Sequence, residues 1–163
     1  MGLNTNFNEW RHRLWLNLYR VKIDDPPRLL QILAIDDSLQ VLTAVKELLG
    51  EVAGPIRVDS ATSAEAGLAL LTREHYDVIL LDLVMPGMDG IAALKEIMRL
   101  RPEQRVLIMS GHSALSYSNA VKRLGARGYL QKEWIPTRLM EAIRALLDGG
   151  EYWCADDGPT VSR

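Results

Sequence analysis

The chain has few of the features that mark membrane, secreted or thiolate-metal proteins. Its one cysteine, Cys154, excludes an internal disulfide and any cysteine-based zinc cluster. Its uninterrupted apolar runs are far shorter than the roughly 18 residues from which a membrane-spanning helix is predicted. Near the start, Asn4, Asn6 and Asn8 interrupt any apolar core of a secretory signal. We therefore expect a cytoplasmic protein.

The chain also lacks a strong charge of either sign. A net charge of −2 provides no broad basic field for nucleic acid or anionic lipid. No basic recognition helix is evident, so we expect no direct nucleic-acid binding. Of its 163 residues, 48% are hydrophobic, which is enough to bury the core of one compact domain.

Strand-like and helix-like segments alternate through most of the sequence. This alternation is typical of a parallel sheet with crossover helices. It predicts an α/β fold of the flavodoxin-like (βα)5 type, a doubly wound parallel sheet with strand order 2-1-3-4-5. The expected strands are 30–35, 56–60, 78–81, 105–109 and 128–131, and the expected helices are 39–51, 62–75, 90–100, 114–124 and 136–147. For the second helix, Thr62 and Glu65 have the spacing of a capping box.

Two flanking segments divide the chain into residues 1–28, 29–150 and 151–163. Residues 7–22 have the periodicity of an amphipathic helix, followed by a proline-containing linker, and the short polar tail from Ala155 onward is expected to be disordered. The aromatic side chains of 7–22 should be covered by the chain's own domain or by a second subunit. The alternatives are a docking peptide for another protein and contact with a membrane surface through its arginines.

A polar side chain stands at the carboxyl end of four predicted strands. The side chains are Asp36, Asp37, Asp82, Ser110 and Lys132. Open parallel sheets bind ligands at this edge, so the three carboxylates should converge there. Like charges at short range raise a pKa or require a cation, and carboxylate oxygens suit Mg²⁺.

This set of residues favours phosphoryl chemistry. Asp82 can act as a nucleophile toward a phosphoryl group, Lys132 can pair with a phosphoryl oxygen, and Ser110 supplies a hydroxyl. Each feature alone has an ordinary explanation, because Asp36 and Asp37 could cap a helix and the loop after Asp82 could be a simple turn. Their shared position at successive strand ends favours one site.

Residues 29–150 resemble the receiver domain of bacterial two-component response regulators. The resemblance implies that Asp36 and Asp37 form the acidic metal-binding pair and that Asp82 is the phosphoacceptor. It further implies roles for a switch hydroxyl, a switch aromatic and a phosphate-binding lysine: Ser110, Tyr129 and Lys132. Segments 128–133 and 149–153 are most similar to receivers of the helix-turn-helix transcription-factor class.

The resemblance also implies a cofactor and partners. Mg²⁺ would bind Asp37, Asp82 and the backbone carbonyl of Val84, with Asp36 acting through water. A sensor histidine kinase or phosphotransfer protein would donate the phosphoryl group. Two surfaces are candidates for a homodimer contact, the face 114–147 and, because of its aromatic side chains, the helix 7–22. Val84 and His112 occupy positions that tune the lifetime of the phosphoryl group in this family.

Two other functions remain open. The chain could be the receiver portion of a longer DNA-binding regulator whose output domain is absent here. It could also be an aspartyl-phosphate phosphotransferase or phosphatase, but such enzymes commonly place a second acid two residues after the nucleophile, where this chain has Val84. We therefore expect a signalling domain that catalyses only its own phosphoryl transfer and dephosphorylation.

Overall fold

The computed structural model describes residues 28–162, apart from residues 53, 113, 156 and 157. The predicted helix at 7–22 lies outside the described residues. Within the described part of the chain, no helix is both long and apolar enough to cross a bilayer. The division of the chain at residues 28 and 150 stays a prediction.

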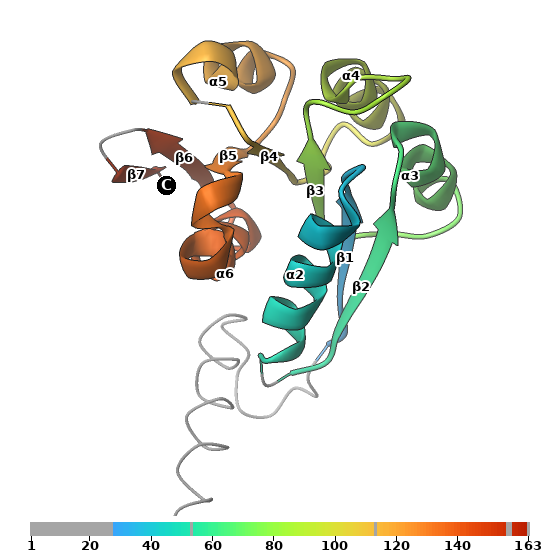
Figure 1. Cartoon of the computed structure of the whole chain (residues 1–163), viewed down its shortest axis with the longest axis horizontal. Helices are drawn as coiled ribbons and strands as arrows, with labels where there is room; N and C mark the ends of the chain where they lie inside the picture. Colours follow the sequence, from blue (N-terminus) through green and yellow to red (C-terminus); the bar gives the residue numbers. More distant parts are fainter. Residues whose placement is uncertain (1–27, 53, 113, 156–157, 163) are drawn as a thin grey trace, which may run out of the picture.

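A single sheet organises the molecule (Figure 1), with strand order β2-β1-β3-β4-β5-β6-β7. The strands are β1 Leu30–Ile35, β2 Ile56–Ala61, β3 Val78–Asp82, β4 Val106–Ser110, β5 Gly128–Gln131, β6 Glu151–Ala155 and β7 Gly158–Ser162. The first six strands run parallel, and β7 pairs antiparallel with β6. The predicted doubly wound fold and its strand order 2-1-3-4-5 are confirmed within this sheet.

Helices cover both faces of the sheet. Helices α2 (Leu39–Gly50) and α6 (Ile135–Leu147) pack on one face, while α3 (Ala64–Leu71), α4 (Gly90–Leu100) and α5 (Ala114–Arg123) pack on the other. A short 3-10 helix, η1 (Lys132–Trp134), joins β5 to α6. Because β3 and β4 are covered on both faces, every residue of these two strands is buried.

The end of the chain differs from the sequence prediction. The five expected strands are extended by β6 and β7, so the expectation of disorder is wrong for residues 158–162. Without β6, strand β5 would present unpaired backbone groups at an open sheet edge. Tyr152 of β6 is fully buried against the α2 and α6 side of the sheet, which fixes the added strand in place.

Helix α3 begins and ends at positions other than those expected. Its N-cap is Ser63 rather than Thr62, because the Ser63 hydroxyl accepts a 3.2 Å hydrogen bond from the Ala66 N–H. It ends at Leu71 rather than near residue 75, and the Arg101 guanidinium donates to the Leu71 carbonyl at 3.1 Å. A side chain distant in sequence therefore satisfies the end of this helix.

Candidate functional site

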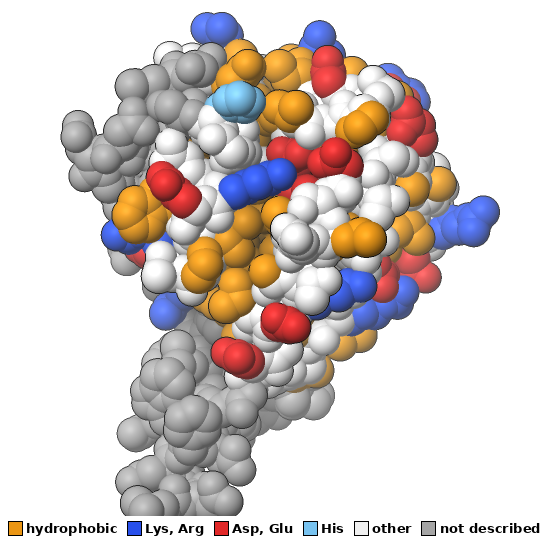
Figure 2. Space-filling view, in the orientation of Figure 1, with side chains coloured by type: hydrophobic (Ala, Val, Ile, Leu, Met, Phe, Trp, Pro, Cys, Tyr) orange, Lys and Arg blue, Asp and Glu red, His pale blue; other side chains and the backbone are white. Residues whose placement is uncertain are grey.

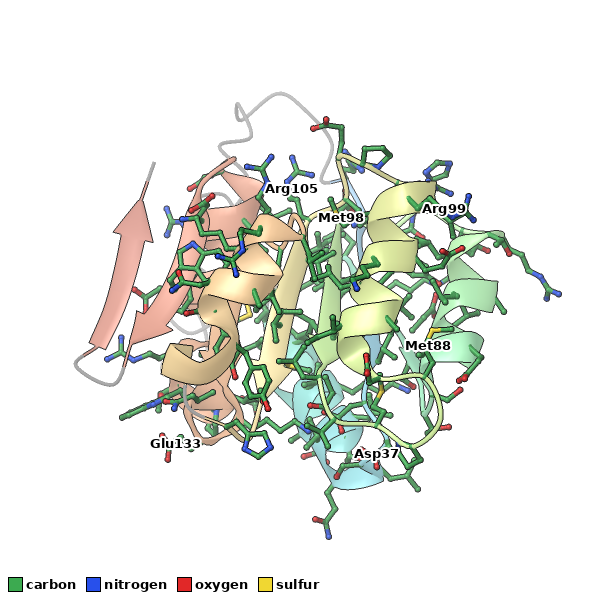
Figure 3. The ribbon with its side chains drawn as sticks, turned by 90° about the horizontal axis from the view of Figure 1, so that it is seen from above. Asp37, Met88, Met98, Arg99, Arg105 and Glu133 are labelled. Carbon is green, nitrogen blue, oxygen red and sulfur yellow. The ribbon has the colours of Figure 1, made fainter. Side chains whose placement is uncertain are left out.

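The predicted site lies at the carboxyl end of the parallel strands. Asp36 follows β1, Asp82 ends β3, Ser110 ends β4 and Lys132 follows β5. In Figure 3, Asp37 and Glu133 lie at this end of the sheet, whereas Arg105 lies at the opposite end. The parallel topology therefore brings together residues that are far apart in sequence.

Three carboxylates form a compact acidic cluster. Each of Asp36, Asp37 and Asp82 offers an oxygen, and these oxygens all lie within 4.8 Å of one another. Asp36 and Asp82 are buried, while Asp37 is exposed. Figure 2 shows acidic side chains gathered at the centre of one face, with a basic side chain beside them. The cluster is thus open to solvent on one side only.

Lys132 is the basic partner of the two buried carboxylates. Its Nζ lies 2.8 Å from Asp36 Oδ2 and 3.1 Å from Asp82 Oδ2. Asp36 Oδ2 is buried, and the contact that the structure gives it is this ion pair with Lys132. Asp36 Oδ1, in contrast, accepts the Ser38 N–H at 2.9 Å. Three carboxylates that share one lysine form an all-oxygen donor set, which fits a hard divalent cation such as Mg²⁺.

The electrostatics of the cluster agree with this fit. Burial raises the pKa of Asp82, and repulsion from Asp36 adds to the effect, although Lys132 and the Val84 N–H oppose it. For Lys132, burial lowers the pKa, but attraction to Asp36 and Asp82 is stronger and leaves the pKa above its usual value. One lysine therefore compensates only part of the acidic charge, and an added cation would relieve the rest.

The loop after Asp82 is held in place by α4 and α3. A Cβ on Gly90 would lie 2.1 Å from the Asp82 carbonyl oxygen, so only glycine allows α4 to begin there. Asp89 caps α4 by accepting the Ala92 N–H at 2.8 Å. Glu65 of α3 accepts the Met88 N–H at 3.3 Å. Sequence analysis missed the role of Glu65 because the contact joins two separate elements.

Ser110 and Tyr129 connect the site to α5. Both are fully buried. The Ser110 Oγ accepts the His112 N–H at 3.2 Å, and the Tyr129 hydroxyl donates to the His112 carbonyl at 3.0 Å. Burial raises the pKa of Tyr129, against the opposing effect of a hydrogen bond with Ser110. The loop leading into α5 is thus held by both hydroxyl groups.

The comparisons with known proteins agree on one family. The model of the response regulator receiver domain matches residues 32–144. The transcriptional regulatory protein DegU of Brevibacillus brevis is 33% identical over 123 residues, which cover 76% of this chain and 52% of DegU. The response regulator UvrY of Escherichia coli K12 is 27% identical over 128 residues, covering 78% of this chain and 59% of UvrY. The chain thus spans little more than half the length of these relatives.

Solved structures give the same result. A two-component response regulator of the LuxR family from Aurantimonas sp. SI85-9A1 superposes with a TM-score of 0.72 at 27% identity, covering 80% of this chain and 92% of that one. TrrA of Thermotoga maritima, determined in complex with Mg²⁺-BeF, gives 0.66 at 26% identity, covering 73% and 100%. The fold, the acidic cluster and these matches lead to one conclusion: the chain belongs to the response regulator receiver domain family.

Proposed function

We propose that this receiver accepts a phosphoryl group on Asp82 from a histidine kinase or phosphotransfer protein, and changes its protein contacts as a result. The observation that carries the proposal is the position of Asp82, which ends a buried strand, lies within the acidic cluster and has Lys132 Nζ at 3.1 Å. The family membership supports the same reading.

The proposed chemistry is a displacement at phosphorus. An Asp82 carboxylate oxygen forms a bond to phosphorus while the bond between phosphorus and the donor's imidazole nitrogen breaks. The electron pair of that bond returns to the imidazole, which takes up a proton from water, and Asp82 becomes an acyl phosphate. Lys132 then pairs with a phosphoryl oxygen and retains Asp36 as its second partner. Hydrolysis of the acyl phosphate by water restores Asp82.

Mg²⁺ is the cofactor that fits this chemistry. Asp37, Asp82 and the Val84 carbonyl would hold it, with Asp36 acting through water, and its charge would offset that of the phosphoryl oxygens. Asp36 and Asp82 are buried, so the inner side of the cluster is shielded from bulk water by the surrounding fold.

Ser110 is the proposed relay from phosphate to α5. Its hydroxyl accepts the His112 N–H, and its proton, which is shared with the Tyr129 hydroxyl in the free protein, would turn to a phosphoryl oxygen. A shift of Ser110 toward the phosphate would move the His112 backbone, which the Tyr129 hydroxyl also holds. Changed contacts on the face 114–147, including a homodimer through that face, would follow from this movement.

A second candidate is that the receiver forms part of a longer transcriptional regulator. DegU is named as a transcriptional regulatory protein, and this chain covers 52% of its length. A phosphatase or phosphotransferase has no comparable support, since Val84, two residues after Asp82, carries no acidic group. Both candidates place the protein in the cytoplasm, where a kinase domain would reach it.

Phosphorylation by acetyl phosphate tests the proposal directly. With Mg²⁺ present, intact mass spectrometry should show one alkali-labile phosphoryl group on the wild-type chain and none on Asp82→Asn. Asp148→Asn, which changes an exposed aspartate at the end of α6, is the matched control and should be labelled like the wild type. Labelling of Asp82→Asn at the wild-type yield, or undiminished labelling in excess chelator, would contradict the proposal.

A further inference from the structure

A cluster of three side chains connects strand β6 to α5. Its members are Lys122, Glu151 and Trp153. Glu151 Oε2 accepts hydrogen bonds from Lys122 Nζ at 2.6 Å and from Trp153 Nε1 at 2.9 Å. Lys122 Nζ also lies 5.0 Å from the centre of the Trp153 ring, within range of a cation–π contact. These interactions lower the pKa of Glu151, with Lys122 the larger cause. We call this set the α5–β6 clasp.

The clasp lies next to Tyr129. In the parallel pairing of β5 with β6, Tyr129 is the register partner of Trp153. Register partners on neighbouring strands place their side chains on the same face of the sheet. Both side chains belong to the core on the α3, α4 and α5 side, where Tyr129 is fully buried and Trp153 is partly buried. Trp153 therefore lies on the β7 side of Tyr129, on the same face of the sheet.

The approach of β6 depends on the residue before Tyr129. A Cβ on Gly128 would lie 2.6 Å from the Tyr152 carbonyl oxygen, so glycine lets the two backbones come this close. In Figure 1, β6 and β7 continue the sheet beyond β5, beside α5 and α6. If β5 were the last strand, Tyr129 would face solvent on the side where β6 now lies.

We propose that Trp153 is a positioning residue that covers Tyr129 on its β6 side, and that the α5–β6 clasp couples Tyr129 and α5 to the chain after α6. The inference rests on the proposed phosphorylation switch for its signalling meaning. The role of Trp153 in covering Tyr129 does not depend on phosphorylation. Tyr129 is held in its buried position by β6 even without a phosphoryl group, and any movement of α5 that separates Lys122 from Glu151 changes the anchorage of β6.

The proposed coupling runs through neighbouring residues from Ser110 to Lys122. The Ser110 Oγ accepts the His112 N–H, the Tyr129 hydroxyl donates to the His112 carbonyl, and Trp153 is the register partner of Tyr129 in the same hydrophobic cluster. The clasp then returns from Trp153 to α5 through Lys122. A change in the loop at His112 should therefore alter the position of residues 151–153 and, through them, of the chain that follows.

The burial of Tyr129 can be measured in the full chain with fluorotyrosine and ¹⁹F NMR. Tyr129 is one of five tyrosines, and Tyr129→Phe assigns its signal. In the wild type the signal should show no solvent isotope shift. Trp153→Ala should shift it toward that of an exposed tyrosine, and Trp153→Phe should restore the buried position. Trp134→Ala is the control, because Trp134 is an exposed tryptophan on η1.

A second variant tests the α5–β6 clasp itself. Lys122→Gln breaks the clasp at a half-exposed side chain without disturbing the core, and should raise amide exchange in β6 by about fivefold or more, at the lower end of allosteric coupling. A Tyr129 signal unchanged in Trp153→Ala, together with unchanged exchange in Lys122→Gln, would overturn the inference.

Addition of Mg²⁺ and beryllofluoride, a phosphoryl analogue, separates this inference from the proposed function. Binding of beryllofluoride is followed by its own ¹⁹F signal. If it does not bind, the proposed function fails, while the Tyr129 comparison in the free protein still decides the role of Trp153. If it binds, its effect on β6 exchange should be larger in the wild type than in Lys122→Gln. Equal effects would refute the coupling.

Discussion

The buried polar groups at the two ends of the parallel sheet differ in how completely they are partnered. At the carboxyl end, Asp36 and Asp82 are buried beside each other with one lysine between them. At the amino end, the Gln104 side chain is also buried, but it donates to the Tyr76 carbonyl at 3.0 Å, and the Tyr76 hydroxyl donates to Asp59 at 2.9 Å. By contrast, the contact that the structure gives the buried Asp36 Oδ2 is an ion pair with a lysine that Asp82 shares.

This difference separates a ligand site from a structural network. Polar groups whose partners within the fold are complete have no remaining capacity for a ligand, whereas carboxylates that share one lysine do. Such an acidic cluster lowers the stability of the folded state. Well-satisfied contacts elsewhere, including the network at the amino end, offset that loss. A cation should therefore stabilise the carboxyl end, and loss of a polar group should have opposite effects at the two ends.

The largest expected effect is stabilisation by Mg²⁺. A ligand that binds only the folded state at 100 times its dissociation constant adds about 2.7 kcal/mol to the free energy of unfolding. Thermal unfolding in MgCl₂ and in NaCl of matched ionic strength should show this increase for the wild type and a smaller one for Asp37→Asn. An equal increase in both proteins would mean that Mg²⁺ acts as a general salt, and the distinction between the two ends would fail.

Removal of Gln104 should lower stability. Gln104→Ala deletes the donor to the Tyr76 carbonyl and leaves that group buried without its partner, at a cost of about 2 kcal/mol. Urea unfolding would measure the change, and Gln40→Ala, at an exposed position on α2, is the matched control. Equal midpoints for the two variants would show that the amino-end network contributes no more than surface residues do.

Neutralising Asp82 should raise stability in the absence of metal. Because the pKa of Asp82 is raised in the folded state, its ionised form opposes folding at neutral pH. Asp82→Asn should therefore increase the free energy of unfolding at pH 7, and the gain should shrink as the pH falls toward 3.8. Asp59→Asn, in the satisfied network, should have the opposite sign. Destabilisation by both substitutions would contradict the comparison.

The sequence was sufficient to predict the carboxyl-end cluster because its signals are local. An apolar run followed by a polar residue places Asp36, Asp82 and Ser110 at strand ends, and parallel topology brings these ends together. Their distances, and the ion pairs of Lys132 with both buried carboxylates, required the structure. The roles assigned to these residues in phosphoryl transfer stay predictions.

The contacts that sequence analysis missed are those between distant elements. Glu65 has the spacing of a capping residue, yet its carboxylate binds the Met88 N–H, because Ser63 rather than Thr62 caps α3. The five residues of β6 carry no periodic signal long enough to distinguish a sheet strand from a tail. Their position depends on the free edge of β5, which exists only after the sheet has formed.

The smallest expected effect concerns Tyr76 and appears only at high pH. Burial raises the pKa of Tyr76 to about 12, and its hydrogen bond to Asp59 adds to the shift. A pKa raised above the value of 10.0 stabilises the fold fully below pH 10, and this contribution is lost as the pH rises toward about 12. Tyr76→Phe should thus cost about 1 kcal/mol at pH 7 through the lost hydrogen bond, and its stability should fall less steeply than that of the wild type above pH 10. Absorbance of the tyrosinate ion follows the titration, and unfolding at each pH measures the stability. If Tyr76 ionises near pH 10, or if the two proteins lose stability in parallel, the amino-end network is as open to solvent as the acidic cluster, and the contrast between the two ends does not hold.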